Sequence, residues 1–475
     1  MLNVRNRLIY VILFTFPWLG TGVRAQSPGM NRLTLPQALD LARTNFPGLQ
    51  AKLAQIRAAE ADRQEVRASL LPQAGIQAQA LNATSNQVRG ASVSSGWLTP
   101  SLSGSIKPNG FTAQPAWTSF VSSFINWEVV TFGRNEALRD QARTALEQQE
   151  SDYERELFVH QFRVCDAYLQ ALNARKELDL QQANLSRVEA IQRITRAGTD
   201  AGLKPGMDSA IVAAEVFRAR TQMLESDRNA RQQLVRLTEL IGQPTTLVEL
   251  DTVAFYSRLP DSPPVAVDAP ALHPTLRWFK KQIDWSEATE KVIRASTMPS
   301  VSVLGGLWGR GSGIRESPEP DGSFRINSSP GAGLPLRAFN YLVGVTAVWQ
   351  PTDLNRAKYA ITAQRERTRA FQAVYEQEAL ALRAGDQNAR LQWDMAQQVA
   401  RQTPRQLAVA RQAYAQAQSR YNAGLDNIMT LTQVVSLLNR SEADQVLAVT
   451  GLWRALLLRA ATSGDLGLFT RAIAP

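Results

Sequence analysis

Hydrophobic residues recur at helical spacing over two stretches of the chain, residues 37–70 and 276–295. A proline follows each stretch, Pro72 after the first and Pro299 after the second. Because proline lacks the amide hydrogen and clashes with the preceding turn, neither helix can continue past that point. The pattern therefore predicts two helices that stop before these prolines.

Alternation of apolar and polar residues replaces the helical period after each proline. It predicts two strands within about 73–131 and two more within about 300–350. The first pair is less regular, because Phe120 and Phe124 fall on the face opposite the other apolar residues. The clearest alternating positions are Val301, Val303, Leu307, Tyr341, Val343, Val345 and Ala347.

Two very long helices come next, predicted over residues 134–199 and 356–423, with Pro404 as a rare interruption. At ~1.5 Å per residue, about 65 residues reach roughly 100 Å, which no ordinary globular core needs. Each long helix is predicted to turn and return, which extends the helical parts to 134–241 and 356–463. Along each long helix, the small and apolar residues expected to pack against a neighbouring helix recur every seven residues in two interleaved series, as in coiled coils. These series form the packing seams of the helices. In the first long helix these seams contain Tyr153, His160, Ala167, Ala174 and Val188, and Leu157, Val164, Ala171, Leu178 and Leu185.

Three stretches show neither period. Residues 90–115 and 309–336 are rich in Gly, Ser, Pro and Asn and are predicted to be loops between the paired strands. Residues 242–274 contain six prolines and are predicted to link the two halves of the chain.

The two halves are copies of one unit. Four features of the first half recur 222 residues later, and the helix end at residues 67–72 recurs 227 residues later at 294–299. A duplication on this scale organises the whole fold. The pairs at the first offset are Trp127 and Trp349, Arg134 and Arg356, Ala201-Gly202-Leu203 and Ala423-Gly424-Leu425, and Met207 and Met429.

These observations divide the chain into five parts. Residues 1–25 are predicted to be a signal peptide, 26–241 the first repeat and 242–274 a linker. The second repeat is predicted over 275–465, and 466–475 form a C-terminal tail.

The predicted signal combines Arg5 and Arg7 with an apolar run at 8–19 and an A-x-A-like site ending at Ala25. Beyond it, no stretch approaches the roughly 18 consecutive apolar residues of a membrane helix. If the mature chain enters a membrane, it must do so as β-strands.

Charge and chemistry point away from an enzyme. The formal net charge is +10, but basic and acidic residues are interspersed along the helices, which favours a solvated surface over a nucleic-acid partner. The single cysteine, Cys165, and the two histidines, His160 and His273, cannot supply a zinc site of usual spacing. We expect no cofactor and no catalytic residues.

Four strands per chain cannot close a transmembrane barrel, for which eight is the usual minimum, and open sheet edges are not tolerated in lipid. If the strands span a membrane, oligomerisation is therefore required. Two copies would give eight strands and a barrel filled by side chains. Three copies would give twelve strands and room for a pore.

Several short motifs occur in a fixed order along the chain. They are Leu33-Thr34-Leu35-Pro36-Gln37-Ala38-Leu39, the Arg-Ala-Ser helix ends before Pro72 and Pro299, Gly133-Arg134, Asn355-Arg356, and the two Ala-Gly-Leu tips. Together these motifs resemble the TolC-type outer-membrane efflux protein family across essentially the whole mature chain. The resemblance implies a mainly α-helical fold with a β-barrel part, two αββα-type repeats, and a homotrimer with a twelve-stranded barrel and a long coiled-coil tunnel. It also implies an outer-membrane export duct that reaches into the periplasm and meets a periplasmic adaptor protein and an inner-membrane pump.

The resemblance also implies a gate where the long helices turn. Asp208, six residues after Gly202, and Tyr421, three residues before Gly424, match the pair that helps to hold the family's entrance closed. The family's arginine two residues after the second tip glycine is replaced here by Asp426.

Two further aspartates that the family carries deeper in the second tip are replaced here by Thr430 and Gln433. The acidic constriction is therefore expected to differ, with Asp208 joined by Asp200 or Asp426. The competing interpretation of Asp208 and Asp426 is that they cap helices.

Two other classes of protein share some of these features. A periplasmic adaptor would also have a helical hairpin, but it should carry Gly-rich lipoyl-like and small-barrel segments that this sequence lacks. A coiled-coil scaffold of the envelope would not need alternating strands.

Overall fold

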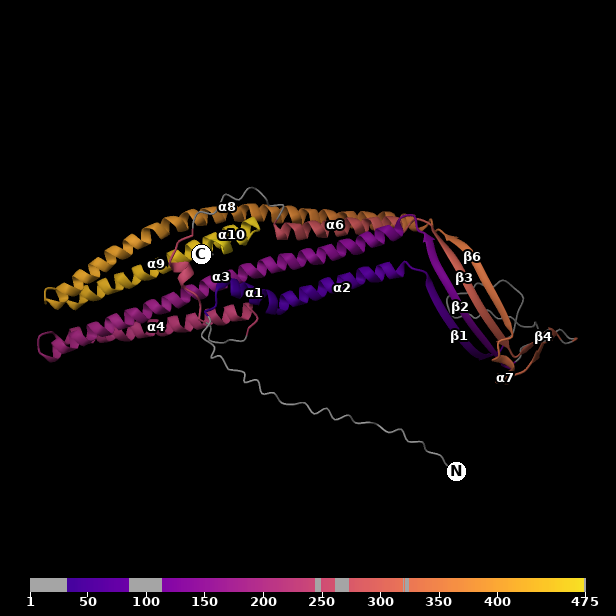
Figure 1. The fold of residues 1–475 in the computed structure, drawn as a ribbon, viewed down its shortest axis with the longest axis horizontal. Helices are drawn as coiled ribbons and strands as arrows, with labels where there is room; N and C mark the ends of the chain where they lie inside the picture. Colours follow the sequence, from indigo (N-terminus) through magenta and orange to yellow (C-terminus); the bar gives the residue numbers. More distant parts are fainter. Residues whose placement is uncertain are drawn as a thin grey trace, which may run out of the picture.

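The computed structural model describes residues 32–84, 113–243, 249–260, 273–318, 320 and 324–473. These residues form an elongated helical body with a β-sheet at one end and the turns of two helical hairpins at the other (Figure 1). The predicted signal peptide and most of the predicted loop at 90–115 lie outside the described residues.

The first predicted helix is wrong in one respect, because the chain forms two helices, α1 (Leu35–Asn45) and α2 (Pro47–Ser69). Phe46 between them has an extended backbone, with φ −70° and ψ 118°. The residue before a proline is disfavoured in the helical conformation, so Pro47 ends one helix and begins the next. The corresponding helix of the second repeat, α6 (Pro274–Ala295), also begins at a proline.

The four long strands form one antiparallel sheet in the order β1-β2-β3-β6. Their bounds are β1 Gln73–Ala83, β2 Ala116–Val130, β3 Ser300–Ser312 and β6 Ala338–Val348. All four strands lie in the predicted segments. Within this sheet β1 and β6 each have a strand on one side only, so both are edges.

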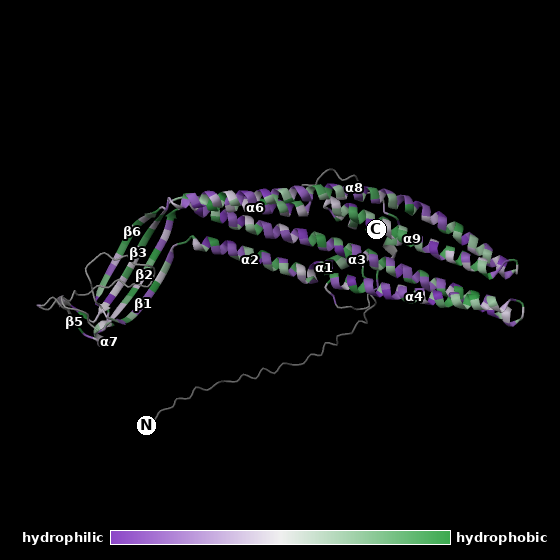
Figure 2. Cartoon of the chain, turned by 180° about the vertical axis from the view of Figure 1, so that it is seen from behind, coloured by the Kyte–Doolittle hydropathy of each residue, from purple (hydrophilic) through white to green (hydrophobic). Residues whose placement is uncertain are grey.

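Strand register gives this sheet two different faces. On one face Trp127, Val303 and Val345 come opposite one another, and all are more than a third exposed. On the other face Ser122 lies opposite Gln77 of β1 and Trp308 of β3. Figure 2 shows apolar and polar residues alternating along the strands. A sheet with an exposed apolar face and a more polar one fits a barrel wall between lipid and a water-filled interior.

The predicted loop at 309–336 is wrong in part. β3 continues to Ser312, and β4 (Ile314–Pro318) and β5 (Phe324–Ile326) pair as a small second sheet. The short helix α7 (Pro330–Gly333) follows. Composition rich in Gly and Ser did not show these short elements, because their pairing is set by partner strands and not by a local period.

The long helices match the prediction closely. α3 covers Arg134–Asp200 and returns as α4 (Gly206–Leu240), and α8 covers Asp353–Asn422 and returns as α9 (Ile428–Ser463). α8 continues through Pro404 as one helix, and it is bowed where α3 is nearly straight (Figure 1). A local bend at Pro404, expected from the lost hydrogen bond, remains a prediction.

The main hydrophobic core lies midway along the helical body. There α1, α3 and α9 meet the predicted linker, which contributes Leu250, bridged to Leu33, and the short helix α5 (Val253–Tyr256). The predicted tail folds as α10 (Gly467–Ile473), and its Phe469 is fully buried in this core.

α9 alone among the described helices is long and apolar enough to cross a membrane, by length and composition only. It packs along α8 and α3, and its Leu452, Trp453 and Leu456 belong to the core. Part of its apolar surface is therefore covered within the helical body.

Candidate functional site at the hairpin turns

The two hairpin turns are built alike. Gly202 lies two residues after the end of α3 with φ 71°, and Gly424 lies two residues after the end of α8 with φ 72°. L-residues with a side chain rarely adopt this left-handed conformation, so glycine suits both points of reversal.

Tyr421 links the two hairpins. It is 2% exposed, and its hydroxyl shares a hydrogen bond of 2.8 Å with the Thr195 hydroxyl of α3. The ammonium of Lys204, in the α3–α4 turn, lies 3.3 Å from the centre of the Tyr421 ring. A cation over an aromatic face is attracted by the ring's electrons, so two residues of the α3–α4 hairpin hold this side chain of the α8–α9 hairpin.

Asp208 lies in the first turn of α4 and is partly exposed. Among the residues that the structure describes, its carboxylate forms no hydrogen bond or ion pair, and it does not meet Tyr421 within one protomer. A carboxylate at this position is favoured by the partial positive charge of the helix N-terminus. Its predicted pairing with Tyr421 remains a prediction.

Asp426 braces the turn before α9. Its carboxylate accepts hydrogen bonds from the Asn427 amide at 2.9 Å and from Arg420 Nε at 3.3 Å. The Asn427 amide, first among several donors, holds the pKa of this carboxyl below its usual value. Asn427 itself caps α9 by accepting from the Thr430 amide at 2.9 Å. The contacts of Asp426 are thus those of a turn-forming residue.

The other expected acidic partner, Asp200, is largely exposed and lies 3.9 Å from Arg196 on its own helix. It does not contact Asp208 among the described residues.

A shared apolar cluster lies behind the turns and contains residues from all four long helices. Its buried members are Val188, Ile191, Val212, Val216, Ala417, Tyr421, Ile428, Leu431 and Val435.

One largely buried ion pair joins the hairpins next to this cluster. Arg187 of α3 donates to both oxygens of Glu442 of α9, at 3.1 and 3.2 Å. Only 16% of the Arg187 side chain and 12% of the Glu442 side chain are exposed. The guanidinium also lies 5.6 Å from the Tyr414 ring.

Sequence reasoning missed Thr195, Lys204 and the Arg187–Glu442 pair. The repeat offered a signal for Lys204, which follows Gly202 by two residues as Asp426 follows Gly424. The basic residue that the second turn lacks is therefore present in the first. Thr195 and Glu442 carry no such signal.

Both histidines have structural surroundings in the helical body. His160 stacks on Phe46 at 3.8 Å between ring centres, and its Nε2 lies 2.9 Å from the Leu240 carbonyl. His273 caps α6, and its Nε2 lies 3.1 Å from the Ala461 carbonyl. Burial lowers the pKa of both imidazoles. No group of three His, Cys, Asp or Glu residues is arranged to hold a metal ion in the described part of the chain.

Comparison with known proteins supports a transport role. The model of the outer membrane efflux protein family matches residues 38–243 and 265–457.

Two relatives share the name pyoverdine export outer membrane protein OpmQ. The Pseudomonas aeruginosa protein is 24% identical over 431 residues, which are 89% of this chain and 84% of that protein. The Pseudomonas putida protein is 24% identical over 284 residues, and this match spans 58% of the chain and only 57% of the relative.

A solved structure of the outer-membrane channel OprN superposes with a TM-score of 0.68 at 21% identity. The match covers 91% of this chain and 90% of OprN. At that identity the similarity establishes a common fold.

Proposed function

Because the chain belongs to the outer membrane efflux protein family, we propose that it works as a homotrimeric outer-membrane export duct. In this assembly three four-stranded sheets join into one twelve-stranded barrel. The helical body continues the duct into the periplasm. The duct is passive and has no catalytic step.

The open sheet carries this proposal. β1 and β6 are both edges, and neither can be left unpaired in lipid, where every backbone polar group needs a partner. Pairing β6 of one copy with β1 of the next closes the ring without a free edge. Twelve strands leave a central pore, whereas eight strands enclose an interior just wide enough for side chains.

The helices support the same assembly. α2 contacts α3, α3 contacts α6, and α6 contacts α8, so the helices follow the order of the strands. α8 also exposes apolar residues that a neighbouring copy can cover, namely Tyr359, Val374, Leu380, Leu391, Met395, Val399 and Val409.

The first prediction is a trimer. Light scattering of the detergent-purified protein, corrected for bound detergent, should give three times the mass of one chain. Replacing Val343 and Val345 of the edge strand by proline removes two strand amides and should release monomers. A stable monomer or dimer of the parent protein contradicts the proposal.

The duct is proposed to meet a periplasmic adaptor and an inner-membrane pump at the hairpin turns. The turns lie at the end of the body farthest from the sheet (Figure 1), where a partner in the periplasm can reach them. The family match favours this function over the adaptor and scaffold alternatives.

We further propose that Tyr421 and Asp208 hold the entrance closed. Tyr421 is clamped by Thr195 and Lys204 within one protomer, while the free carboxylate of Asp208 is left for a neighbouring copy. A single hydrogen bond contributes about 1 kcal/mol, so a few such contacts can hold a gate that adaptor binding then opens.

The second prediction tests this gate by single-channel conductance in planar bilayers. Tyr421→Phe, which removes only the hydroxyl, and Asp208→Ala should each raise the open probability severalfold while leaving the trimer intact. Asp200→Ala, an exposed acidic residue near the same turn, is the matched control and should behave as the parent. If both gate variants conduct like the parent, these two residues do not form the gate.

A further inference from the structure

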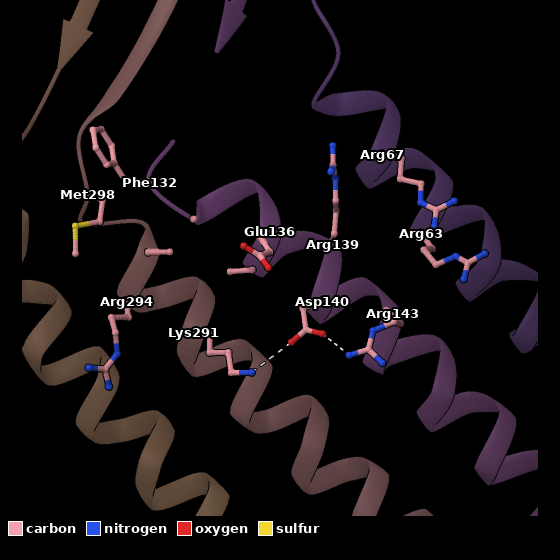
Figure 3. Close-up of a pocket in the computed structure, with 13 residues that line it drawn as sticks. Arg63, Arg67, Phe132, Glu136, Arg139, Asp140, Arg143, Lys291, Arg294 and Met298 are labelled. Carbon is pink, nitrogen blue, oxygen red and sulfur yellow. Dashed lines mark hydrogen bonds and ion pairs between the residues drawn. The ribbon is translucent and has the colours of Figure 1, made fainter. Parts of the chain in front are cut away.

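A cavity of about 630 Å³ opens between α2, α3 and α6, where these helices approach the sheet (Figure 3). Its lining is strongly basic, with six cationic side chains against the two carboxylates of Glu136 and Asp140. The cationic residues are Arg63, Arg67, Arg139, Arg143, Lys291 and Arg294.

Carboxylates pair with four of the six cationic residues. Glu60 pairs with Arg63, Glu147 with Arg143 and Glu290 with Arg294. Asp140 is shared between Arg143 and Lys291 (Figure 3). Arg67 and Arg139 form no ion pair with any residue that the structure describes. The two guanidinium groups of Arg67 and Arg139 therefore keep donors available toward the cavity.

The second repeat provides an internal comparison. At the offset of 227 residues, Arg63 corresponds to Glu290 of α6. Glu290 accepts hydrogen bonds from Arg294 at 2.7 Å and from Arg365 of α8 at 3.1 Å. Its carboxylate therefore balances positive charge where α6 meets α8. The first repeat has an arginine in place of this carboxylate, so the excess positive charge belongs to one junction of the two.

The heptad repeat of α3 shows which face of the helical body the cavity opens on. Asp140, Glu147 and Glu154 follow one another at seven-residue spacing, and the same series reaches Tyr168. Tyr168 donates to the Leu33 carbonyl at 2.8 Å, in the segment that packs across the middle of the body. In the proposed three-copy assembly, the segment containing Leu33 would obstruct the tunnel if it lay on the inner face of the helices. The face of α3 that carries Tyr168 and Asp140 is therefore the outer face.

An apolar rim borders the cavity on the side of the sheet. Phe132 follows the end of β2 and is 57% exposed, and Met298 precedes β3 and is 48% exposed. Figure 3 shows both on the strand side of the charged groups. The cavity thus presents cations toward the periplasm and apolar side chains toward the barrel.

We propose that this cavity binds the phosphate headgroup of an anionic phospholipid of the periplasmic leaflet, with its acyl chains lying along Phe132 and Met298. Guanidinium groups match the geometry of phosphate and bind it with paired hydrogen bonds. Basic residues at the membrane surface attract anionic lipids. The assignment rests on the proposed function, because it takes the base of the sheet as the membrane boundary.

The test is a titration of the full-length trimer in dodecyl maltoside with fluorescent short-chain phosphatidylglycerol, with phosphatidylcholine as the neutral comparison. The parent should prefer phosphatidylglycerol, and Arg67→Gln with Arg139→Gln should weaken its binding roughly tenfold. Arg193→Gln with Arg236→Gln removes the same charge from exposed sites on α3 and α4 and should leave binding unchanged.

Three outcomes overturn the site: equal binding of the two lipids, unchanged binding by the double variant, or an equal loss in the control variant. Displacement of the lipid by millimolar inorganic phosphate would instead overturn the lipid as the source and assign the cavity to free phosphate. Bilayer conductance of the same preparations separates this question from the proposed function, since a trimer that conducts without lipid preference refutes only the site.

Discussion

Replacing Trp453 by alanine is expected to destabilise the helical body by about 3–5 kcal/mol, the usual range for a buried tryptophan. The ring is 2% exposed and makes edge contacts with Phe255 of α5 and Phe469 of α10. Its Nε1 donates to the Phe255 carbonyl at 2.9 Å. The substitution therefore leaves both a cavity and a buried carbonyl without its partner.

Thermal unfolding of the purified protein, followed by helical circular dichroism, measures this effect. Trp453→Phe keeps most of the packing and should lower the unfolding midpoint clearly less than Trp453→Ala does. Leu447→Ala, at a 56% exposed position of the same helix, serves as the surface control and should lower the midpoint least. Equal midpoints for Trp453→Ala and Leu447→Ala would show that this core does not hold the two halves of the chain together.

Removing Glu442 is expected to cost up to about 3 kcal/mol and to loosen the hairpins. Glu442→Ala leaves the Arg187 guanidinium largely buried without its carboxylate, and one nitrogen of that group, Nη1, already lacks a partner. Because the pair joins α3 to α9 beside the apolar cluster of the turns, we also expect a higher open probability in bilayers.

A double-mutant comparison tests the origin of this effect. Arg187→Met combined with Glu442→Leu removes both charges and should recover most of the lost stability, since replacing a buried pair by apolar residues is often neutral. Asp227→Ala breaks the exposed pair with Arg231 and should cost less than about 1 kcal/mol. If the double variant is as unstable as Glu442→Ala, packing and not the buried charge is responsible.

Elements with a strong local period follow from the order of residues along the chain. The extent of α3, the return of α9 from Ile428 to Ser463, and the placement of all four long strands agree with the periodicity of the chain. The same holds for Gly202 and Gly424, whose left-handed backbone follows from a reversal at that point. Such features depend on neighbouring residues, which the sequence contains directly.

Family resemblance, carried by short motifs, was enough to indicate the outer-membrane channel. It located the turns, whereas the gate expected there remains a prediction. Within one chain Asp200 lies near Arg196 and Asp426 near Arg420, each on its own hairpin.

The residues that meet across the hairpins depend on how the folded helices pack. Tyr421 and Thr195 are 226 residues apart in the chain, and Arg187 and Glu442 are 255 apart. The basic cavity likewise draws its charges from three helices, and the break at Phe46 lies inside a pattern that is helical on both sides. These features depend on the rotation and register of packed helices. A heptad pattern fixes which face of a helix is buried, but not which residue of another helix lies against it.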